Sequence, residues 1–345
     1  MSQIGVVVIG RNEGERLTRC LLSLGRERAR GVYVDSGSAD ASVGTARSMG
    51  WQVVELDQSL PFSAARGRNE GFQALLRAKQ EIEFVQFVDG DCELEAGWLE
   101  LGRQTLEAHP DVAAVCGRIR ERNARTSIYR RLCDVEWSKP VGQVKACTGI
   151  AMIRAEAFRQ VNGFDPKVMG AEDGELCLRL RRKRWKILRL ETDMVLHDSD
   201  MTRFSQWWRR SVRAGHGFAQ GMAMHGGTPE RHFKRECRST LLWGFILPLL
   251  MVSISLPTHG LSFLLALLYP LQAWRISASL RRRGIAPAES ALYAGFCVVG
   301  MLPTFLGMLL YYVDTIRGRQ GRLIEHKKPP KPSLPGVNPG NPPPA

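Results

Sequence analysis

Short apolar runs rich in β-branched residues alternate with helical patterns through the first ninety residues of the chain. Residues 4–9 (IGVVVI) form an almost unbroken apolar run, as expected for a strand covered on both faces, and residues 13–24 then space their leucines at helical intervals. Further strands are expected at 32–35, 52–56 and 84–88, and further helices at 40–49 and 62–77. This alternation predicts an α/β fold with a mostly parallel sheet flanked by helices and connected by right-handed crossovers.

Three polar stretches follow these expected strands, at residues 11–13, 35–38 and 89–91. Ligands of open parallel sheets bind beyond the carboxyl ends of the strands, so the three stretches are expected to meet at one site. Beyond residue 97 the pattern is mixed, and this region would form the other side of the site. Helices are expected there at 98–109 and 172–184, and strands at 112–117 and 194–196.

A strongly apolar region extends from about residue 241 to 313. It holds two runs between 241 and 274, separated by the sequence PTHG, and a third run at 291–313. A membrane-spanning helix needs about 20 apolar residues, so the first run qualifies marginally, the second is short and the third qualifies. We expect two to three spanning or interfacial helices; the alternative is a pair of buried core helices with interfacial anchoring.

The basic residues near these runs bear on their orientation. If the α/β domain lies in the cytosol, the first two runs form a hairpin that returns residues 275–283 to the cytosol. The third run would then place the basic residues 317–328 outside, against the positive-inside bias. Pro303 could instead break that run into a re-entrant or interfacial pair, so two topologies stay open.

The chain is strongly basic, with a formal net charge of +14 and a pI of about 9.8, and should attract polyanions. Two of its basic clusters, at 281–283 and 317–328, flank apolar segments. Lipid headgroups explain that placement better than nucleic acid does, so membrane lipids are expected partners and nucleic acid is not.

The eight cysteines are scattered, without CxxC spacing or a neighbouring histidine pattern. This excludes a zinc ribbon and a disulfide framework and suits a reducing cytosol. The chain runs from Met1 directly into the first strand, so a cleaved signal peptide is not expected. We expect an α/β domain at 1–235, membrane helices at 236–316, and at 317–345 a basic, then Pro/Gly-rich, disordered tail.

Asp89 and Asp91, separated by one glycine, directly follow an apolar strand. Mg²⁺ and Mn²⁺ take oxygen ligands and commonly bridge carboxylates to substrate phosphates. The glycine lets the backbone turn closely beneath a ligand. The alternative is a plain turn, because Asp and Gly are also common turn residues.

A longer series of motifs is more specific than this pair. It reads VVVIGRNEGERLTRCLLSL, VYVDSGSAD, ARGRNEG, FVDGDCE, CTGIAMIRAEAF with NGFD, and AEDGELCLRLRRKRW. Over residues 3–217 the series resembles, in order and spacing, the family 2 glycosyltransferases of the GT-A fold, of the inverting, membrane-associated bacterial type. The resemblance implies transfer of a sugar from a nucleotide-diphosphate-sugar to an acceptor hydroxyl, with Mn²⁺ or Mg²⁺ as cofactor.

The resemblance also implies a donor site. Its residues would be Asn12, Glu13, Asp35, Arg66, Arg68, Asn69 and Asp89. Asp35 would hold the nucleobase, and Arg66 or Arg68 the diphosphate, since a guanidinium can grip phosphate through two hydrogen bonds. Asp35 as a cap before a helix, and Arg68 as a surface pairing residue, are the alternatives.

The implied metal ligands are Asp91 as the principal one, Asp89 beside it, and His197. A neutral imidazole can complete such a coordination shell, although a lone histidine is more often a structural residue.

Glu172 and Asp173 match the acid pair of the family, so Asp173 would be the general base that takes the proton of the acceptor hydroxyl as its oxygen attacks the anomeric carbon. The metal and an arginine would stabilise the leaving diphosphate. Alone, the pair is also an ordinary acidic helix start. Thr148 and Gly149 resemble the acceptor-side element, with a plain glycine turn as the alternative.

Two departures from the family pattern stand out. Glu175 occupies a position where Asp is usual, and the QxxRW motif of processive enzymes is absent, its nearest counterpart being residues 206–210. Processive polymer synthesis is therefore disfavoured.

The prediction is thus an inverting glycosyltransferase with a lipid-linked or glycan acceptor, at a bacterial inner membrane with its catalytic domain facing the cytoplasm. Two alternatives are a sugar-phosphate nucleotidyltransferase and a non-catalytic membrane protein that binds nucleotide-sugars.

Overall fold

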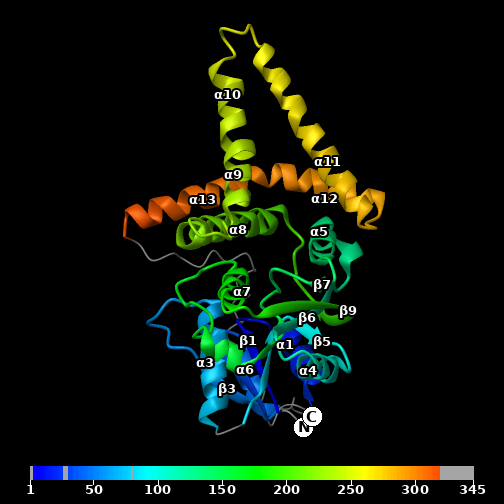
Figure 1. Ribbon diagram of the computed structural model, residues 1–345, viewed down its shortest axis with the longest axis vertical. Coiled ribbons are helices and arrows are strands. Elements are labelled where there is room, and N and C mark those ends of the chain that lie inside the picture. The colour runs from blue at the N-terminus through cyan, green and yellow to red at the C-terminus, as the bar shows by residue number, and fades with distance from the viewer. Residues whose placement is uncertain (1–2, 26–29, 79–80, 319–345) are drawn as a thin grey trace, which may run out of the picture.

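The two ends of the molecule differ in architecture (Figure 1). The computed structural model describes residues 3–25, 30–78 and 81–318. A nine-stranded sheet with flanking helices forms one end, and the helices of residues 204–316 form the other. Beyond residue 318, the predicted tail lies outside the described residues.

The first four strands form a parallel half-sheet in the order β3-β2-β1-β4. Their bounds are β1 Ile4–Gly10, β2 Gly31–Asp35, β3 Gln52–Glu55 and β4 Phe84–Asp89. Residues 6–8 of β1 are fully buried, as expected for a strand covered on both faces. Gly10 pairs with Asp35 and Ile9 with Asp89, so the three predicted polar stretches meet at one edge of the sheet.

The second half of the sheet is mixed. It continues from β4 through β8 (Ala151–Arg154), β6 (Val112–Glu121), β9 (Lys186–His197) and β5 (Cys92–Leu94), with β7 (Gly142–Gln143) also on β9. β8 is antiparallel to β4 and β6, β9 is parallel to β6, and β5 and β7 are antiparallel to β9. The parallel arrangement expected from the sequence therefore holds for the first half. The second half departs from it because β8 enters antiparallel between β4 and β6.

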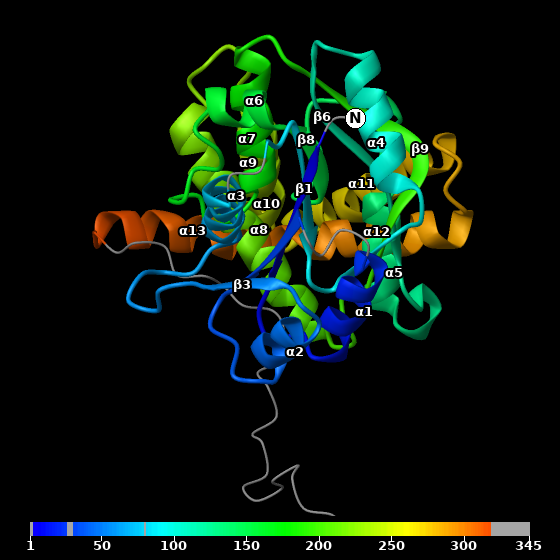
Figure 2. The same cartoon turned by 90° about the horizontal axis from the view of Figure 1, so that it is seen from below.

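Helices cover both faces of the sheet. Beside β1, α3 (Ala64–Arg77) and α6 (Ala155–Gln160) lie on one side, and α1 (Glu15–Ser23) and α4 (Trp98–Ala108) on the other (Figure 2). The remaining helices of this end are α2 (Ser42–Ser48), α5 (Ile128–Trp137) and α7 (Glu172–Arg182), with a short 3₁₀ turn, η2, at Ala124–Thr126. On α1, Leu17, Cys20 and Leu21 are buried, the spacing of a helix with one apolar face.

Three helices lie across the end of the sheet domain: α8 (Phe204–His225), α12 (Pro287–Val299) and α13 (Met301–Ile316) (Figure 1). α8 and α13 cross with their backbones in contact. A Cβ at Gly215 would overlap the carbonyl oxygen of Thr304, and one at Gly307 would overlap that of Val212. Glycine at both positions therefore allows the close crossing.

A hairpin projects from this layer. One arm consists of α9 (Lys234–Leu241), the π-helical η3 (Leu242–Ile246) and α10 (Leu247–Ser253), and the other of η4 (Leu261–Leu267) and α11 (Leu268–Arg282). Its surface is apolar, with Leu256, Leu267 and Trp274 exposed by 88%, 65% and 66%. Such a large exposed apolar surface is typical of a membrane-facing segment.

In the described part of the chain, three helices are long and apolar enough to cross a membrane. They are Lys234–Ser253, Leu261–Arg282 and Pro287–Ile316. The first two form the predicted hairpin. The third runs crosswise to the hairpin against α8, and its two halves, α12 and α13, meet at Gly300 (Figure 1). The junction lies at Gly300, and Pro303, where the sequence analysis placed the break, lies within α13.

Candidate active site

The loop after β2 is fixed by Asp35 and Asn12. Asp35 is buried and accepts hydrogen bonds from the Tyr33 hydroxyl (2.9 Å), the Ser38 backbone N–H (2.7 Å) and the Ser38 hydroxyl (2.5 Å). Burial, followed by the nearby Asp35 carboxylate, raises the pKa of Tyr33. Asn12, at a φ of 55°, accepts from the backbone N–H of Ala39 through Oδ1 (2.7 Å). The ends of β1 and β2 thus form one preformed rim, with Glu13 buried beside it.

Arg68 connects the two acidic motifs of the site. Its guanidinium is 3% exposed and bonds Asp89 Oδ1 through Nη2 (2.8 Å) and Glu172 Oε1 through Nη1 (2.9 Å). Burial alone would lower the pKa of Arg68, but the carboxylates of Asp89 and Glu172 raise it above its usual range. The turn after β4 and the start of α7 therefore lie on either side of one side chain.

Gly149 gives Arg68 its space. A Cβ at this position would lie 2.5 Å from Cζ of Arg68, closer than any real contact allows. Thr148, the other predicted acceptor-side residue, closes a local turn, with its Oγ1 donating to the carbonyl of Ile150 (3.0 Å). Both residues line the region of Arg68, and the glycine is needed for packing.

Asp173 differs from Glu172 in its electrostatic environment. Burial, and after it the negative charge of Glu172, raises the pKa of Asp173 to about 6. Burial would also raise the pKa of Glu172, but Arg68 and Arg213 lower it below its usual range. The pair therefore has one firmly ionised carboxylate and one that exchanges a proton near neutral pH, as suits a general base.

Asp91, Cys92 and His197 form the group of potential metal ligands found in the described residues, with one ligand atom of each within 4.8 Å of the others. His197 Nε2 lies 3.5 Å from Asp91 Oδ2. Burial, and then the charges of Asp91 and Asp89, raise the pKa of Cys92 well above its usual value. A hard cation such as Mn²⁺ or Mg²⁺ prefers oxygen donors to sulfur. The remaining carboxylate and imidazole donors fit Mn²⁺ or Mg²⁺.

Glu121, which the sequence analysis did not single out, orients His197. Its Oε2 lies 2.8 Å from His197 Nδ1, and its Oε1 accepts from the Ser199 backbone N–H (3.0 Å) and hydroxyl (2.6 Å). The Trp137 ring packs edge-on against the imidazole, with centroids 4.4 Å apart. A carboxylate behind a metal-binding histidine fixes its ring and tautomer.

Two predicted diphosphate contacts have other partners. Both polar atoms of the Asn69 amide bind the backbone of Phe164: Nδ2 donates to its carbonyl (2.7 Å), and Oδ1 accepts from its N–H (2.9 Å). Arg66 donates to the carbonyl of Leu60 (3.0 Å) in the loop before α3. Asn69 therefore positions the NGFD turn through both atoms of its amide.

The unusual Glu175 has a structural role. It is buried and paired with Arg179 (2.6 Å) and with His225 Nε2 (3.0 Å), at the last turn of α8. It thus ties the helix that carries Asp173 to the helix above it. The spacing of Glu175 and Arg179, four residues apart on one helix, was a detectable signal of this pairing.

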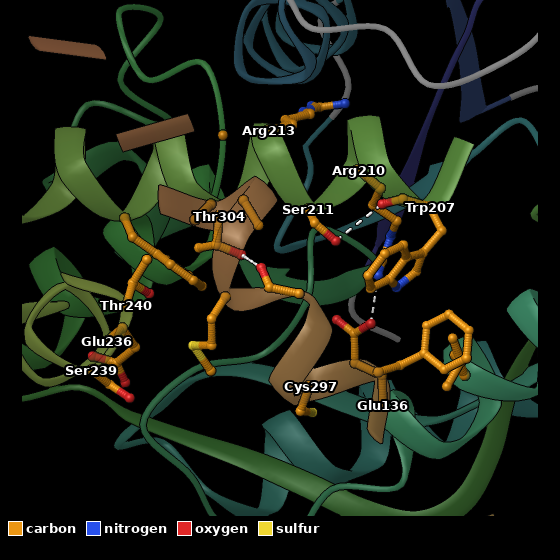
Figure 3. A pocket seen from close by; sticks show the side chains of 18 of the residues that line it. Glu136, Trp207, Arg210, Ser211, Arg213, Glu236, Ser239, Thr240, Cys297 and Thr304 are labelled. Carbon is orange, nitrogen blue, oxygen red and sulfur yellow. Dashed lines mark hydrogen bonds and ion pairs between the residues drawn. The ribbon is translucent and has the colours of Figure 1, made fainter. Parts of the chain in front are cut away.

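A cavity of about 670 Å³ extends from Asp173 to the helical layer. Its lining includes Gly170 and Asp173, together with residues of α9, α12 and α13. Trp207, Arg210 and Arg213 of α8 also line it (Figure 3). This cavity joins the acidic pair of α7 to the candidate membrane helices.

Comparisons with known proteins bear on the family and the fold of the chain. Residues 5–160 match the family described as Glycosyl transferase family 2, and residues 132–203 match the one described as N-terminal domain of galactosyltransferase. The pre-mycofactocin glycosyltransferase of Mycobacterium tuberculosis, from strains CDC 1551 and H37Rv, is 28% identical over 270 residues, which cover 73% of this chain and 53% of that protein. The chain therefore spans about half the length of these curated relatives.

A solved structure shares the fold at low sequence identity. The mannosyltransferase PcManGT from Pyrobaculum calidifontis, in complex with GDP-Man and Mn²⁺, superimposes with a TM-score of 0.60 at 17% identity, over 90% of this chain and 87% of that one. The likeness supports the mixed α/β sheet with flanking helices as a GT-A arrangement.

Proposed function

We propose that this chain, which matches glycosyltransferase family 2 over residues 5–160, transfers a sugar from a nucleotide-diphosphate-sugar to the hydroxyl of a lipid-linked or glycan acceptor. The observation that carries the proposal is the double ion pair of Arg68, with Asp89 at 2.8 Å and Glu172 at 2.9 Å. It places a carboxylate pair suited to base catalysis beside the strand ends where a nucleotide would bind.

The donor would lie across the ends of β1, β2 and β4. Asp35, with Asn12 and Glu13, would hold the nucleobase side, and Arg66, in the loop before α3, would approach the diphosphate. Asp91, Asp89 and His197 would hold a divalent cation, Mn²⁺ or Mg²⁺, and Glu121 would orient the imidazole. When bound, the ion would neutralise the negative charge that develops on the leaving diphosphate. The Mn²⁺ named with the structurally similar mannosyltransferase supports this choice.

The chemical step would be a single displacement with inversion. The acceptor oxygen forms a bond to the anomeric carbon as the bond from that carbon to the diphosphate oxygen breaks, and the hydroxyl proton passes to Asp173. The raised pKa of Asp173, about 6, makes it a stronger base than an ordinary aspartate while leaving it mostly ionised at neutral pH. Glu172 keeps the negative charge beside it and is itself held by Arg68.

The helical layer would lie at the surface of a membrane, with the hairpin of α9–α11 inserted and the sheet domain in the cytoplasm. The basic residues Arg281, Arg282 and Arg283 at the end of α11 support this orientation, because cytoplasmic segments are enriched in Lys and Arg. In a bacterium the membrane would be the inner one. Membrane lipids are then partners as well as neighbours of the acceptor.

The full chain in detergent should release nucleoside diphosphate from one member of a panel of nucleotide-sugars in the presence of Mn²⁺. Asp173→Asn should lower turnover by about 10²- to 10⁴-fold, because it removes the base, while donor-dependent thermal stabilisation stays. Asp111→Asn is the matched control, since Asp111 is exposed and pairs only with Lys186 among the described residues (2.6 Å).

Other outcomes would point elsewhere. Equal turnover of Asp173→Asn and wild type would remove the base assignment. Donor binding without turnover in any condition would favour a nucleotide-sugar-binding protein. Pyrophosphate release from a nucleoside triphosphate and a sugar phosphate would favour a nucleotidyltransferase.

A further inference from the structure

The cavity beneath the helical layer is lined by both apolar and charged side chains; Figure 3 labels Trp207, Arg210 and Arg213 among them. Its apolar lining residues include Phe218 of α8, Tyr293 and Phe296 of α12, and Met301 at the start of α13. A sugar or peptide with no apolar part would leave these surfaces in contact with water. An apolar chain would remove them from water at about 25 cal/mol per Å².

The polar residues that line the cavity include three arginines, Arg210, Arg213 and Arg235. Arg210 is neutralised by Glu136, at 2.6 Å. The guanidinium groups of Arg213 and Arg235 form no hydrogen bond or ion pair with the described part of the chain, although Arg213 lowers the pKa of nearby Glu172. The acid Glu236 also lines the cavity, next to Arg235 on α9. Arg213 is half-buried and Arg235 is exposed, and two arginines without an acidic partner among the described residues beside one cavity favour an anionic ligand.

A second hollow continues this charge toward the hairpin. It has a volume of about 430 Å³ and is lined by Glu230, Arg231, Lys234, Arg235 and Arg238. Its one acid, Glu230, is already paired with Arg182 at 3.2 Å, so the four basic residues dominate. Arg235 lines both spaces. A cationic hollow at the base of a membrane hairpin is the place where the phosphate of a lipid would lie.

We infer that the two spaces form the acceptor site and that the acceptor is an amphiphile with a phosphate-bearing head group. The phosphate binds at Arg235 and the other basic residues of α9. The apolar chain lies along Phe218, Tyr293 and Phe296, and the accepting hydroxyl reaches Asp173. This inference rests on the proposed function only in its last step, because binding of the amphiphile requires no sugar transfer.

The test uses the full chain in phosphatidylcholine nanodiscs, without donor, and dodecyl phosphate as probe. Dodecyl phosphate should raise the melting temperature more than dodecanol or inorganic phosphate does, since only the first supplies both parts of the ligand. Arg235→Glu should weaken dodecyl phosphate binding about tenfold or more. Arg209→Glu is the matched control, because Arg209 is exposed on α8 and lies outside the cavity.

A second variant tests the cavity rather than the charge. Ser239→Trp places a bulky side chain among the lining residues and should abolish stabilisation by dodecyl phosphate, while stabilisation by the nucleotide-sugar with Mn²⁺ remains. Retained donor stabilisation also shows that the variant is folded.

Three results would overturn the inference. An equal loss of dodecyl phosphate binding in Arg209→Glu would indicate attraction to the general surface charge, and equal stabilisation of the protein by dodecanol would show that the phosphate is not recognised. Unchanged dodecyl phosphate binding in Ser239→Trp would show that the ligand does not occupy the cavity. A protein that binds dodecyl phosphate as expected but never turns over donor would instead refute the proposed function alone.

Discussion

The edge of the sheet where β1, β2 and β4 end, here called the donor edge, differs from the cavity beneath the helical layer in how its charged groups are paired. At the donor edge the charged and polar groups are already paired with one another: Asp35 with Ser38, Arg68 with two carboxylates, and Glu121 with His197. In the cavity, Arg213 and Arg235 have no such partner among the described residues. The first region is preorganised and loses little conformational freedom on binding, whereas the second depends on its ligand to supply the opposite charge.

Removing Arg68 should disturb the donor edge most. Arg68→Met leaves Glu172, 12% exposed, and Asp89, 35% exposed, without this cation. Breaking a fully buried pair from one side costs about 3–5 kcal/mol, which is an upper bound for two carboxylates that water reaches. We expect the melting temperature, measured by differential scanning calorimetry, to fall by several degrees. We also expect turnover, measured as nucleotide release, to be lost.

The control for this change lies on the same helix. Arg66→Met removes an equal charge whose hydrogen bonds with the described residues go to backbone carbonyls of the preceding loop, so it should change the melting temperature little. A similar loss of stability in both variants would mean that Arg68 acts through general charge rather than through its two ion pairs.

A change at Glu121 should have a smaller effect on the donor edge than the loss of Arg68. Glu121→Gln keeps the shape of the side chain but weakens its hold on His197 Nδ1 and should raise the Mn²⁺ concentration needed for half-maximal activity about 10- to 100-fold. Activity at saturating Mn²⁺ should largely return. Glu191→Gln, at an exposed position of β9, should leave the metal requirement unchanged. A fall in activity that excess Mn²⁺ does not restore would contradict an orienting role.

The helical layer is tested by a change in packing rather than by a change in charge. Gly307→Ala introduces a methyl group into the backbone of α8 at Val212 and should cost about 1–3 kcal/mol by overpacking. Because the change lies in the layer that closes the cavity, dodecyl phosphate binding should weaken more than donor binding. Gly295→Ala on α12, where a Cβ meets nothing within 4 Å, should be neutral or slightly stabilising. Equal effects at the two glycines would contradict the close crossing.

The two regions also differ in how far the sequence predicts them. Asp35, Asp89 and Glu172 lie at the ends of local elements, directly after a strand or at the start of a helix, so a pattern of a few residues suffices to locate them. The parallel half-sheet and the hairpin were predicted for the same reason, since periodicity and apolar length are local properties.

What the sequence did not predict depends on contacts between distant segments. Glu121 and His197 are 76 positions apart and meet only because β6 pairs with β9. The cavity exists because α13 crosses α8 at two glycines, and no local pattern indicates which glycines meet. The hydrogen bonds of Asn69 to the backbone of Phe164, 95 positions away, were not predicted either, because they join two distant segments.

The smallest expected effect separates the two carboxylates of the acid pair. Asp173 can accept a proton only when ionised, and with a pKa of about 6 its ionised fraction, and therefore turnover at saturating substrates, should fall as pH drops below that value. Replacing Glu172 with Gln removes the negative charge that raises the pKa of Asp173 and leaves the positive charge of Arg68, which lowers it. The pKa of Asp173 should therefore fall, so the acid limb of the pH–rate profile should move to lower pH in Glu172→Gln and stay in place in Glu191→Gln. A limb that moves to higher pH, or does not move, would mean that another group limits the rate and that Asp173 is not the base.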